Sequence, residues 1–151
     1  MRTMCWNCRG IGNPATVREL RDLVEASAPS VLCIIETQLA KYRVEGLAGR
    51  LDFSSSFGVG SSGISGGLCL YWKNNINLEI KSFSQYHIDS VISQPGEEPW
   101  QLSCFYGAAN RSLRYNTWDM MKFLRGESTL TIKKDTSVTF WAERKKFLSY
   151  I

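Results

Sequence analysis

The chain has 151 residues, of which 44% are hydrophobic and 21% are charged. This composition suits one folded domain with an apolar core, and it excludes a disordered or fibrous chain. No apolar run approaches the roughly 18 residues that a membrane span needs, so no membrane partner is expected. The net charge of +4 is too small to identify nucleic acid as a partner by itself.

The five cysteines are odd in number, and most of them fall inside apolar segments. This pattern predicts buried free thiols in a reducing compartment, and therefore an intracellular location, with the nucleus left open. The residues after Met1 lack the apolar stretch of a secretory signal. Cys5 and Cys8 have C-x-x-C spacing, but no second pair accompanies them, so strand packing is favoured over metal or redox chemistry.

The first residues predict a strand, a helix and a second strand. The first strand covers Arg2–Asn7 and is stopped by glycines. Asn13 is a good N-cap for a helix that begins at Pro14, because proline is tolerated at the first helical position. That helix ends at Ala28–Pro29. The five consecutive apolar residues at 31–35 predict a strand buried on both faces.

The rest of the chain predicts mostly strands, followed by one more helix. A second, weaker helix is expected over 38–51, and a strand with a Ser- and Gly-rich loop over 53–65. Four further strands are expected at 68–72, 78–83, 88–93 and 100–106. A helix over 112–124 would contribute core contacts through Leu113, Trp118, Met121 and Leu124. A β-α-β start followed by consecutive strands favours a mixed α/β sandwich.

Two features resemble functional motifs without the context that such motifs need. Residues 58–63 match G-x-G-x-x-G, but they lead into a strand rather than a helix, so a flexible connection is favoured over a dinucleotide site. His87 is the only histidine in the sequence and lies between two predicted strands. A structural role is favoured for His87 over a catalytic one.

Polar side chains stand at the ends of three predicted strands. Asn7 ends the first strand, Glu36 follows the buried one, and Tyr106 ends the last. Parallel neighbouring strands would bring Asn7 and Glu36 to one rim, where α/β proteins usually place their sites. An amide beside a carboxylate suits Mg²⁺, although a residue in the position of Glu36 is more often a solvated strand end than a metal ligand. Tyr106 is equally explained as a half-buried tyrosine whose hydroxyl reaches water.

Five segments in one order resemble the N-terminal half of an endonuclease/exonuclease/phosphatase domain. They are Trp6–Pro14, Glu36–Thr37, Ser65–Trp72, His87–Asp89 and Phe105–Gly107. The sequence is most similar to the apurinic-endonuclease-like domain of plant non-LTR (LINE-type) retrotransposons. The resemblance implies a deoxyribonuclease-I-like four-layer α/β sandwich that cleaves DNA phosphodiester bonds with Mg²⁺ or Mn²⁺. It also implies that Glu36 binds the metal, that Asn7 orders the metal-bound oxygens and the phosphate, and that Tyr106 reaches the scissile phosphate.

The resemblance covers residues 1–125, a partial domain, and a divergent basic tail occupies 126–151. The family continues with a Gly-Asp-Phe-Asn strand and ends with a Ser-Asp-His segment. This sequence has no Gly-Asp or Asp-His pair, and Asp135 lacks the flanking pattern. The basic clusters 133–134 and 144–146 are interpreted as a solvated tail. We therefore expect the chain alone to be inactive.

Truncation would leave one sheet's inner face without its partner, so self-association through an uncovered sheet face is expected. Two alternatives to the inactive nuclease remain. One is a non-catalytic nucleic-acid-binding or interaction module, and the other is a fragment of a phosphatase from the same superfamily.

Overall fold

The computed structural model of the chain describes residues 1–107, 112, 114–127 and 137–141. The elements, in chain order, are β1 (Arg2–Asn7), α1 (Pro14–Ser27), β2 (Val31–Ile35), α2 (Lys41–Glu45), the 3₁₀-helix η1 (Gly49–Leu51), β3 (Ser55–Val59), β4 (Leu68–Trp72), β5 (Asn77–Ser84), β6 (His87–Ser93), β7 (Trp100–Phe105), α3 (Arg114–Glu127) and β8 (Ser137–Trp141). No helix among the described residues has the length and apolar character needed to cross a membrane.

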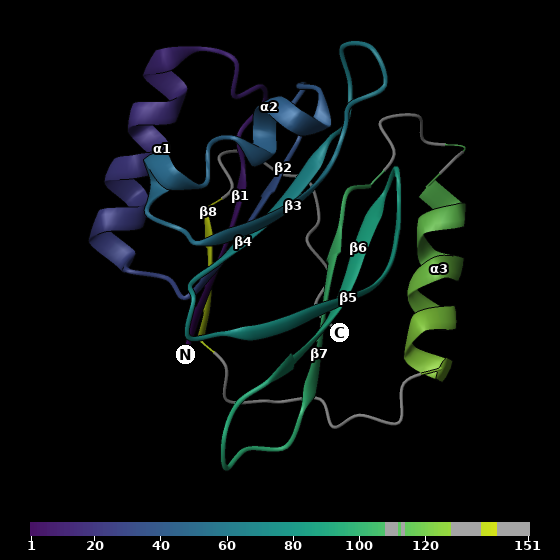
Figure 1. Cartoon of the computed structure of the whole chain (residues 1–151). Helices are drawn as coiled ribbons and strands as arrows, with labels where there is room; N and C mark the ends of the chain where they lie inside the picture. The colour runs from purple at the N-terminus through teal and green to yellow at the C-terminus, as the bar shows by residue number, and fades with distance from the viewer. Residues whose placement is uncertain (108–111, 113, 128–136, 142–151) are drawn as a thin grey trace.

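The strands form two sheets that face each other. One has the order β3-β4-β2-β1-β8, and the other has the order β5-β6-β7. Figure 1 shows α1 and α2 outside the first sheet and α3 on the far side of the second. This arrangement of helices, sheet, sheet and helix is the mixed α/β sandwich that the sequence predicted.

The strand β2 lies at the centre of the molecule and is buried along its whole length. Because successive side chains of a strand point to opposite faces, it contributes to two apolar cores. Leu32 and Ile34 pack in the core beneath α1 and α2. Val31, Cys33 and Ile35 pack in the core between the sheets. This explains why the sequence of β2 is a continuous apolar run.

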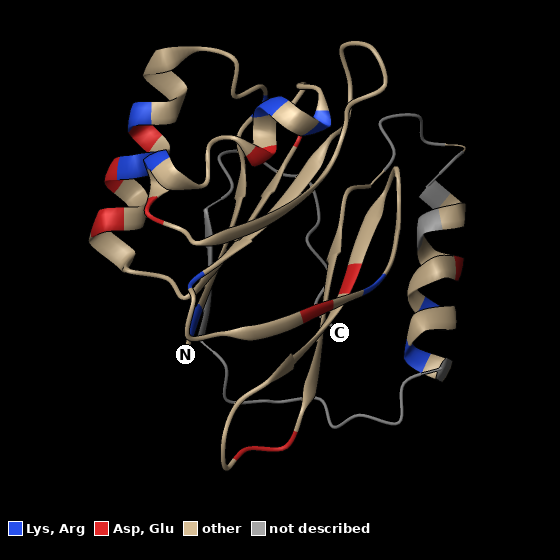
Figure 2. Ribbon diagram, viewed as in Figure 1, with Lys and Arg blue, Asp and Glu red and all other residues tan. Residues whose placement is uncertain are grey.

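The helix α1 begins as its sequence predicts. The Asn13 side chain accepts a hydrogen bond from the Ala15 amide at 2.8 Å, and Pro14 occupies the first turn. Val17, Leu20 and Val24 are buried against the sheet side of the helix. The outer face of α1 carries charges of both signs, as Figure 2 shows.

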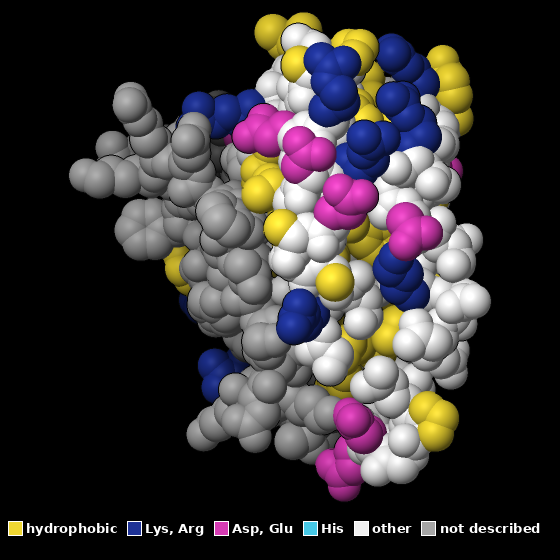
Figure 3. Space-filling model, turned by 90° about the vertical axis from the view of Figure 1, so that its left-hand side faces the viewer, with side chains coloured by type: hydrophobic (Ala, Val, Ile, Leu, Met, Phe, Trp, Pro, Cys, Tyr) yellow, Lys and Arg dark blue, Asp and Glu magenta, His cyan; other side chains and the backbone are white. Residues whose placement is uncertain are grey.

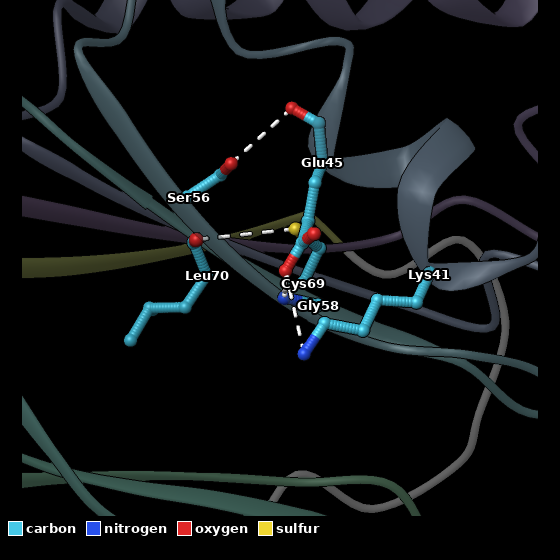
Figure 4. A network of polar contacts seen from close by, with 6 residues as sticks. All are labelled: Lys41, Glu45, Ser56, Gly58, Cys69 and Leu70. Carbon is cyan, nitrogen blue, oxygen red and sulfur yellow. Dashed lines mark hydrogen bonds and ion pairs between the residues drawn. The ribbon is translucent and has the colours of Figure 1, made fainter.

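A polar network attaches α2 to β3 (Figure 4). The Glu45 carboxylate accepts a hydrogen bond from the Gly58 amide at 2.8 Å, and the Glu45 carbonyl oxygen accepts one from the Ser56 hydroxyl at 3.2 Å. Lys41 lies 3.8 Å from the same carboxylate. A Cβ at Gly58 would lie 3.0 Å from the Val44 side chain, so glycine lets the helix approach closely. The network therefore holds α2 against β3.

Several expectations about the middle and the end of the chain are wrong. Instead of the single helix expected over 38–51, residues 41–45 form α2 and residues 49–51 form η1. Gln38 adopts the left-handed region, so α2 begins only at Lys41, and it ends at Glu45 with Gly46 as its C-cap. Met121 and Leu124 are buried as predicted, but Trp118 is 51% exposed, and Leu113 lies outside the described residues.

The inner faces of the two sheets cover each other over β2 and β4. Ile88, Ile92 and Trp100 of the second sheet pack in one core with Val31 and Leu70 of the first. The expectation that an inner sheet face would lack its partner is therefore wrong for these strands.

The predicted tail 126–151 contains the described strand β8, which pairs in parallel with β1. Its basic clusters at 133–134 and 144–146, and Asp135, lie outside the described residues.

Candidate active site

The carboxyl ends of β1 and β2 lie side by side at one edge of the five-stranded sheet. The two strands are parallel, with Asn7 opposite Ile35 in the register. The Cys8 amide continues the pairing by donating to the Ile35 carbonyl oxygen at 3.1 Å. Glu36 is the next residue after β2. The predicted juxtaposition of Asn7 and Glu36 at one rim therefore follows directly from the strand register.

Glu36 occupies an unfavourable backbone conformation. Its φ is +57°, and that of Gln38, two residues later, is +53°. Side chains other than glycine cost roughly 1–2 kcal/mol in this left-handed region. The Gly10 amide donates to the Glu36 carbonyl oxygen at 2.7 Å, which holds the strained residue in place. Such strain gathers at functional sites, where the surrounding structure dictates the direction of a side chain.

The loop between β3 and β4 returns to the same rim. The amides of Thr37 and Gln38 donate to the carbonyl oxygens of Gly67 and Gly66, at 3.3 and 3.0 Å. Gly67 has a φ of +92°, and a Cβ there would lie only 2.1 Å from the Thr37 Oγ1 atom. Only glycine fits this position. The tandem glycines therefore clamp the loop 60–67 against the segment that carries Glu36.

Tyr106 brings the second sheet to this rim. It follows β7, and its amide donates to the Tyr86 carbonyl oxygen at 2.8 Å. Burial raises the pKa of the Tyr106 hydroxyl, and the charge of the Glu36 carboxylate and a hydrogen bond to it raise that pKa further. A Cβ at Gly66 would lie 3.8 Å from the Tyr106 ring, so the loop 60–67 packs beside it. Two of the predicted residues, Glu36 and Tyr106, therefore interact at this rim.

Asn7 contributes an amide to the same edge. Its Oδ1 atom accepts a hydrogen bond from the Arg9 amide at 3.2 Å, which orients the side chain. Arg9 itself has a φ of +47°. The β1–α1 loop is therefore as sharply shaped as the loop that carries Glu36.

The donor set at the rim suits a hard cation and no soft one. Mg²⁺ is commonly held by one or two carboxylates together with substrate phosphates and waters. The Glu36 carboxylate and the side-chain amide oxygen (Oδ1) of Asn7 match that pattern. Among the described residues, no three His, Cys, Asp or Glu side chains are grouped to hold a metal. The rim therefore fits a magnesium site that the protein shares with substrate phosphates and waters. It does not fit a zinc site filled by protein ligands alone.

Basic side chains surround this end of the molecule. Arg9 is exposed in the β1–α1 loop, and Lys41 and Arg43 are exposed on α2, which begins shortly after Glu36. Figure 3 shows the face over α1 and α2, where Lys and Arg side chains gather toward the upper end and acidic ones lie below them. This placement favours an anionic ligand at the rim.

His87 lies at the end of β6 that pairs with Phe105, next to the rim, but its side chain is on the face of β6 opposite Ile88 and Ile92. Its two ring nitrogens lie 3.2 Å from the Ser82 hydroxyl and 2.7 Å from the Ser84 hydroxyl. The ring also stacks on Phe105. Burial lowers the pKa of His87, although the charge of Asp89 opposes this. His87 thus ties the β5–β6 hairpin together, which is the structural role that the sequence favoured.

The cysteine pair and the glycine motif also lie in structural settings. Cys8 packs in the core beneath the helices, and Cys5 packs against the core between the sheets, so the two thiols face opposite sides of the sheet. Burial raises the pKa of Cys8 to about 12. Residues 58–63 run from β3 into the loop before β4, so a strand and not a helix comes directly after them.

Sequence reasoning missed the role of the loop 60–67 and of Gln38. The sequence signal for the loop was the pair Gly66-Gly67, directly before the strand Leu68–Trp72. Tandem glycines at that position indicate a backbone that must approach another segment closely.

Comparisons with solved structures show the fold. The chain resembles an AP endonuclease from Leishmania major with 19% identity and a TM-score of 0.53, covering 79% of this chain and 44% of that one. It resembles a 3'-5' exonuclease from Neisseria meningitidis with 13% identity and a TM-score of 0.57, covering 84% and 52%. It also resembles D. rerio TDP2, crystallised with a single-strand DNA product, with 17% identity and a TM-score of 0.54, covering 91% and 58%.

The chain therefore spans about half the length of these structures. A comparison with curated protein sequences found no match. The sequence profile of the Endonuclease/Exonuclease/phosphatase family matches residues 4–135, which is most of the chain. The chain belongs to the Endonuclease/Exonuclease/phosphatase family.

Proposed function

We propose that this chain carries the metal- and phosphate-binding part of a Mg²⁺-dependent DNA endonuclease site of the retrotransposon type. The observation that carries the proposal is the convergence of Asn7, Glu36 and Tyr106 at one rim, where the Glu36 charge affects the Tyr106 hydroxyl. Glu36 would bind the metal, with Asn7 orienting oxygens around it. A bound Mg²⁺ would supply charge stabilisation at the phosphate.

Tyr106 is suited to donate a hydrogen bond to a phosphate oxygen. Because burial and the Glu36 carboxylate raise the pKa of its hydroxyl, the group stays protonated at neutral pH. A bound cation would engage the carboxylate and leave the hydroxyl free to turn to the phosphate. Arg9, Lys41 and Arg43 would attract the DNA backbone to the rim by charge.

The same proposal predicts that the chain alone does not cleave DNA. The sequence contains neither a Gly-Asp nor an Asp-His pair, so it lacks the Asp and His that would activate water in the resembled family. Without a general base, binding of metal and phosphate gives no turnover. The chain alone would then act as a nucleic-acid-binding module, and the free thiols support an intracellular location.

Metal and DNA binding test the proposal. In titrations followed by the electron paramagnetic resonance of Mn²⁺, the chain should bind the ion, and Glu36→Gln should weaken binding about tenfold or more. Glu79→Gln, an exposed carboxylate paired with Lys81, is the matched control and should bind as the wild type does. Equal Mn²⁺ affinity for all three proteins would refute the metal site.

Plasmid nicking tests the second part. With supercoiled plasmid and Mg²⁺, no nicking above background is expected from the wild type. Nicking that disappears in Glu36→Gln but persists in Glu79→Gln would show that the chain is an active nuclease. A retained activity on small phosphomonoesters, with no DNA binding, would favour a phosphatase instead.

A further inference from the structure

The helix α3 has an exposed face with three large aromatic side chains that nothing in the described structure covers. Met121 and Leu124 are buried, whereas Tyr115, Trp118 and Phe123 are 69%, 51% and 60% exposed. At roughly 100° per residue Tyr115 lies opposite the buried pair, with Trp118 about 60° to one side of it and Phe123 about 80° to the other. Figure 1 shows α3 at the outside of the molecule, beyond the three-stranded sheet. Three large aromatic side chains gathered on one exposed face mark an interaction surface.

The middle of this exposed face is a regular seam. Tyr115, Asp119, Lys122 and Gly126 follow one another at steps of four, three and four residues, the spacing of a helix–helix contact. Trp118 and Phe123 flank the seam on its two sides. Asp119, Lys122 and Gly126 are exposed, like the aromatic residues.

We propose that a second copy of this chain covers the exposed face of α3, through an antiparallel pairing of the two α3 helices. A two-fold axis between residues 120 and 121 sets Asp119 of each copy opposite Lys122 of the other. The same axis sets Tyr115 opposite Gly126, where the missing side chain leaves room for the ring. The seam is thus complementary to itself in charge and in shape, which a symmetric interface requires.

The charge of the seam argues against a nucleic acid as the occupant. Asp119 and Lys122 balance each other along it, and exposed Arg125 beside Trp118 adds a single positive charge, which is little for a phosphate backbone. The flanking Trp118 and Phe123 supply the large aromatic surface that dominates protein–protein contacts. The proposal concerns a surface remote from the rim, and it holds or fails independently of any nuclease function.

Sedimentation of the full chain over a range of concentrations tests the proposal. The wild type should convert from monomer to dimer, and the double variant Trp118→Ser, Phe123→Ser should weaken the dimer about tenfold or more. Tyr42→Ser removes a comparably exposed aromatic side chain, on α2, and should leave the dimer unchanged. A wild type that remains monomeric throughout, or a double variant that dimerises as the wild type does, would overturn the proposal.

Charge reversal tests the geometry and does not depend on the aromatic residues. Asp119→Lys alone places two lysines opposite each other at both of the symmetry-related 119–122 positions, and Lys122→Asp alone does the same with two aspartates. Each variant should dimerise poorly by itself, while an equimolar mixture of the two should form a heterodimer. Circular dichroism of each variant checks that α3 remains helical. Folded single variants that do not associate when mixed would exclude the antiparallel register.

Discussion

The Tyr106 hydroxyl and the Glu36 carboxylate join the two sheets of this molecule at one rim. Glu36 follows β2 of the five-stranded sheet, and Tyr106 follows β7 of the three-stranded sheet. Burial and the nearby Glu36 carboxylate together raise the pKa of the Tyr106 hydroxyl, so the two residues influence each other across the junction of the sheets. A site composed in this way exists only once both sheets have packed together.

Removing the Tyr106 hydroxyl tests its contribution to stability and its contribution to DNA binding separately. Tyr106→Phe keeps the ring packing but removes one hydrogen bond to a charged group, so the free energy of unfolding should fall by about 1.5–3 kcal/mol. Mg²⁺-dependent binding of DNA should also weaken, while Mn²⁺ affinity stays close to that of the wild type. Urea unfolding followed by tryptophan fluorescence and a DNA titration measure the two effects. Unchanged DNA binding in a less stable variant would leave Tyr106 with a structural role only.

The left-handed backbone at Glu36 should cost stability whenever the residue is not glycine. Glu36→Ala and Glu36→Gly both remove the carboxylate, but only glycine adopts a φ of +57° without strain. Glu36→Gly should therefore be more stable than Glu36→Ala by about 1 kcal/mol, and neither variant should hold the metal. Two equally stable variants would show that the left-handed conformation costs nothing here.

His87 predicts a loss of stability at acidic pH. Its pKa is lowered in the folded chain relative to the ordinary value of 6.5, so the unfolded chain binds the extra proton first. The contribution is therefore complete above pH 6.5 and is lost as the pH falls through 6.5 toward the folded pKa. Urea unfolding at a series of pH values from 7.5 downward should show this decline.

The matched variant His87→Gln should flatten the same decline, because glutamine does not titrate yet can still hydrogen-bond to Ser82 or Ser84. The ring's serine partners and Phe105 are uncharged, and the charge that acts on its pKa is that of Asp89, whose carboxylate is held by Gln101 and Ser103. An equally steep pH dependence in the variant would assign the effect to other groups.

Local signals predicted the elements around the site, and long-range packing decided the rest. Short patterns in the sequence were enough to predict the N-cap at Asn13 and the continuous apolar run of β2. The same holds for the strand ends at Asn7 and Glu36. Trp118 looked like a core residue because its apolar neighbours share the helix, but α3 contacts the rest of the molecule on one face only. Which apolar face of a helix is buried depends on the sheet beneath it, and no pattern within the helix contains that information.

The helix expected over 38–51 failed for a related reason. The propensities of its residues suit a helix, but the segment must first return to the loop 60–67 through the amides of Thr37 and Gln38. Those tertiary hydrogen bonds favour the left-handed turn over a continuous helix.

Gly67 provides the sharpest test of how the rim is assembled. Gly67→Ala would place a Cβ 2.1 Å from the Thr37 Oγ1 atom, in addition to the strain of a φ of +92°. Gly63→Ala meets the same backbone requirement, with a φ of +65°, but no atom lies within 4 Å of its Cβ. We expect Gly63→Ala to cost about 1 kcal/mol of unfolding free energy and Gly67→Ala about 2–4 kcal/mol, because the latter must also displace the segment behind Glu36. Urea unfolding measures both values, and Mn²⁺ affinity should fall only in Gly67→Ala. Equal costs for the two variants would show that the loop 60–67 is free to move away from Thr37, and the loop would then have no part in positioning Glu36.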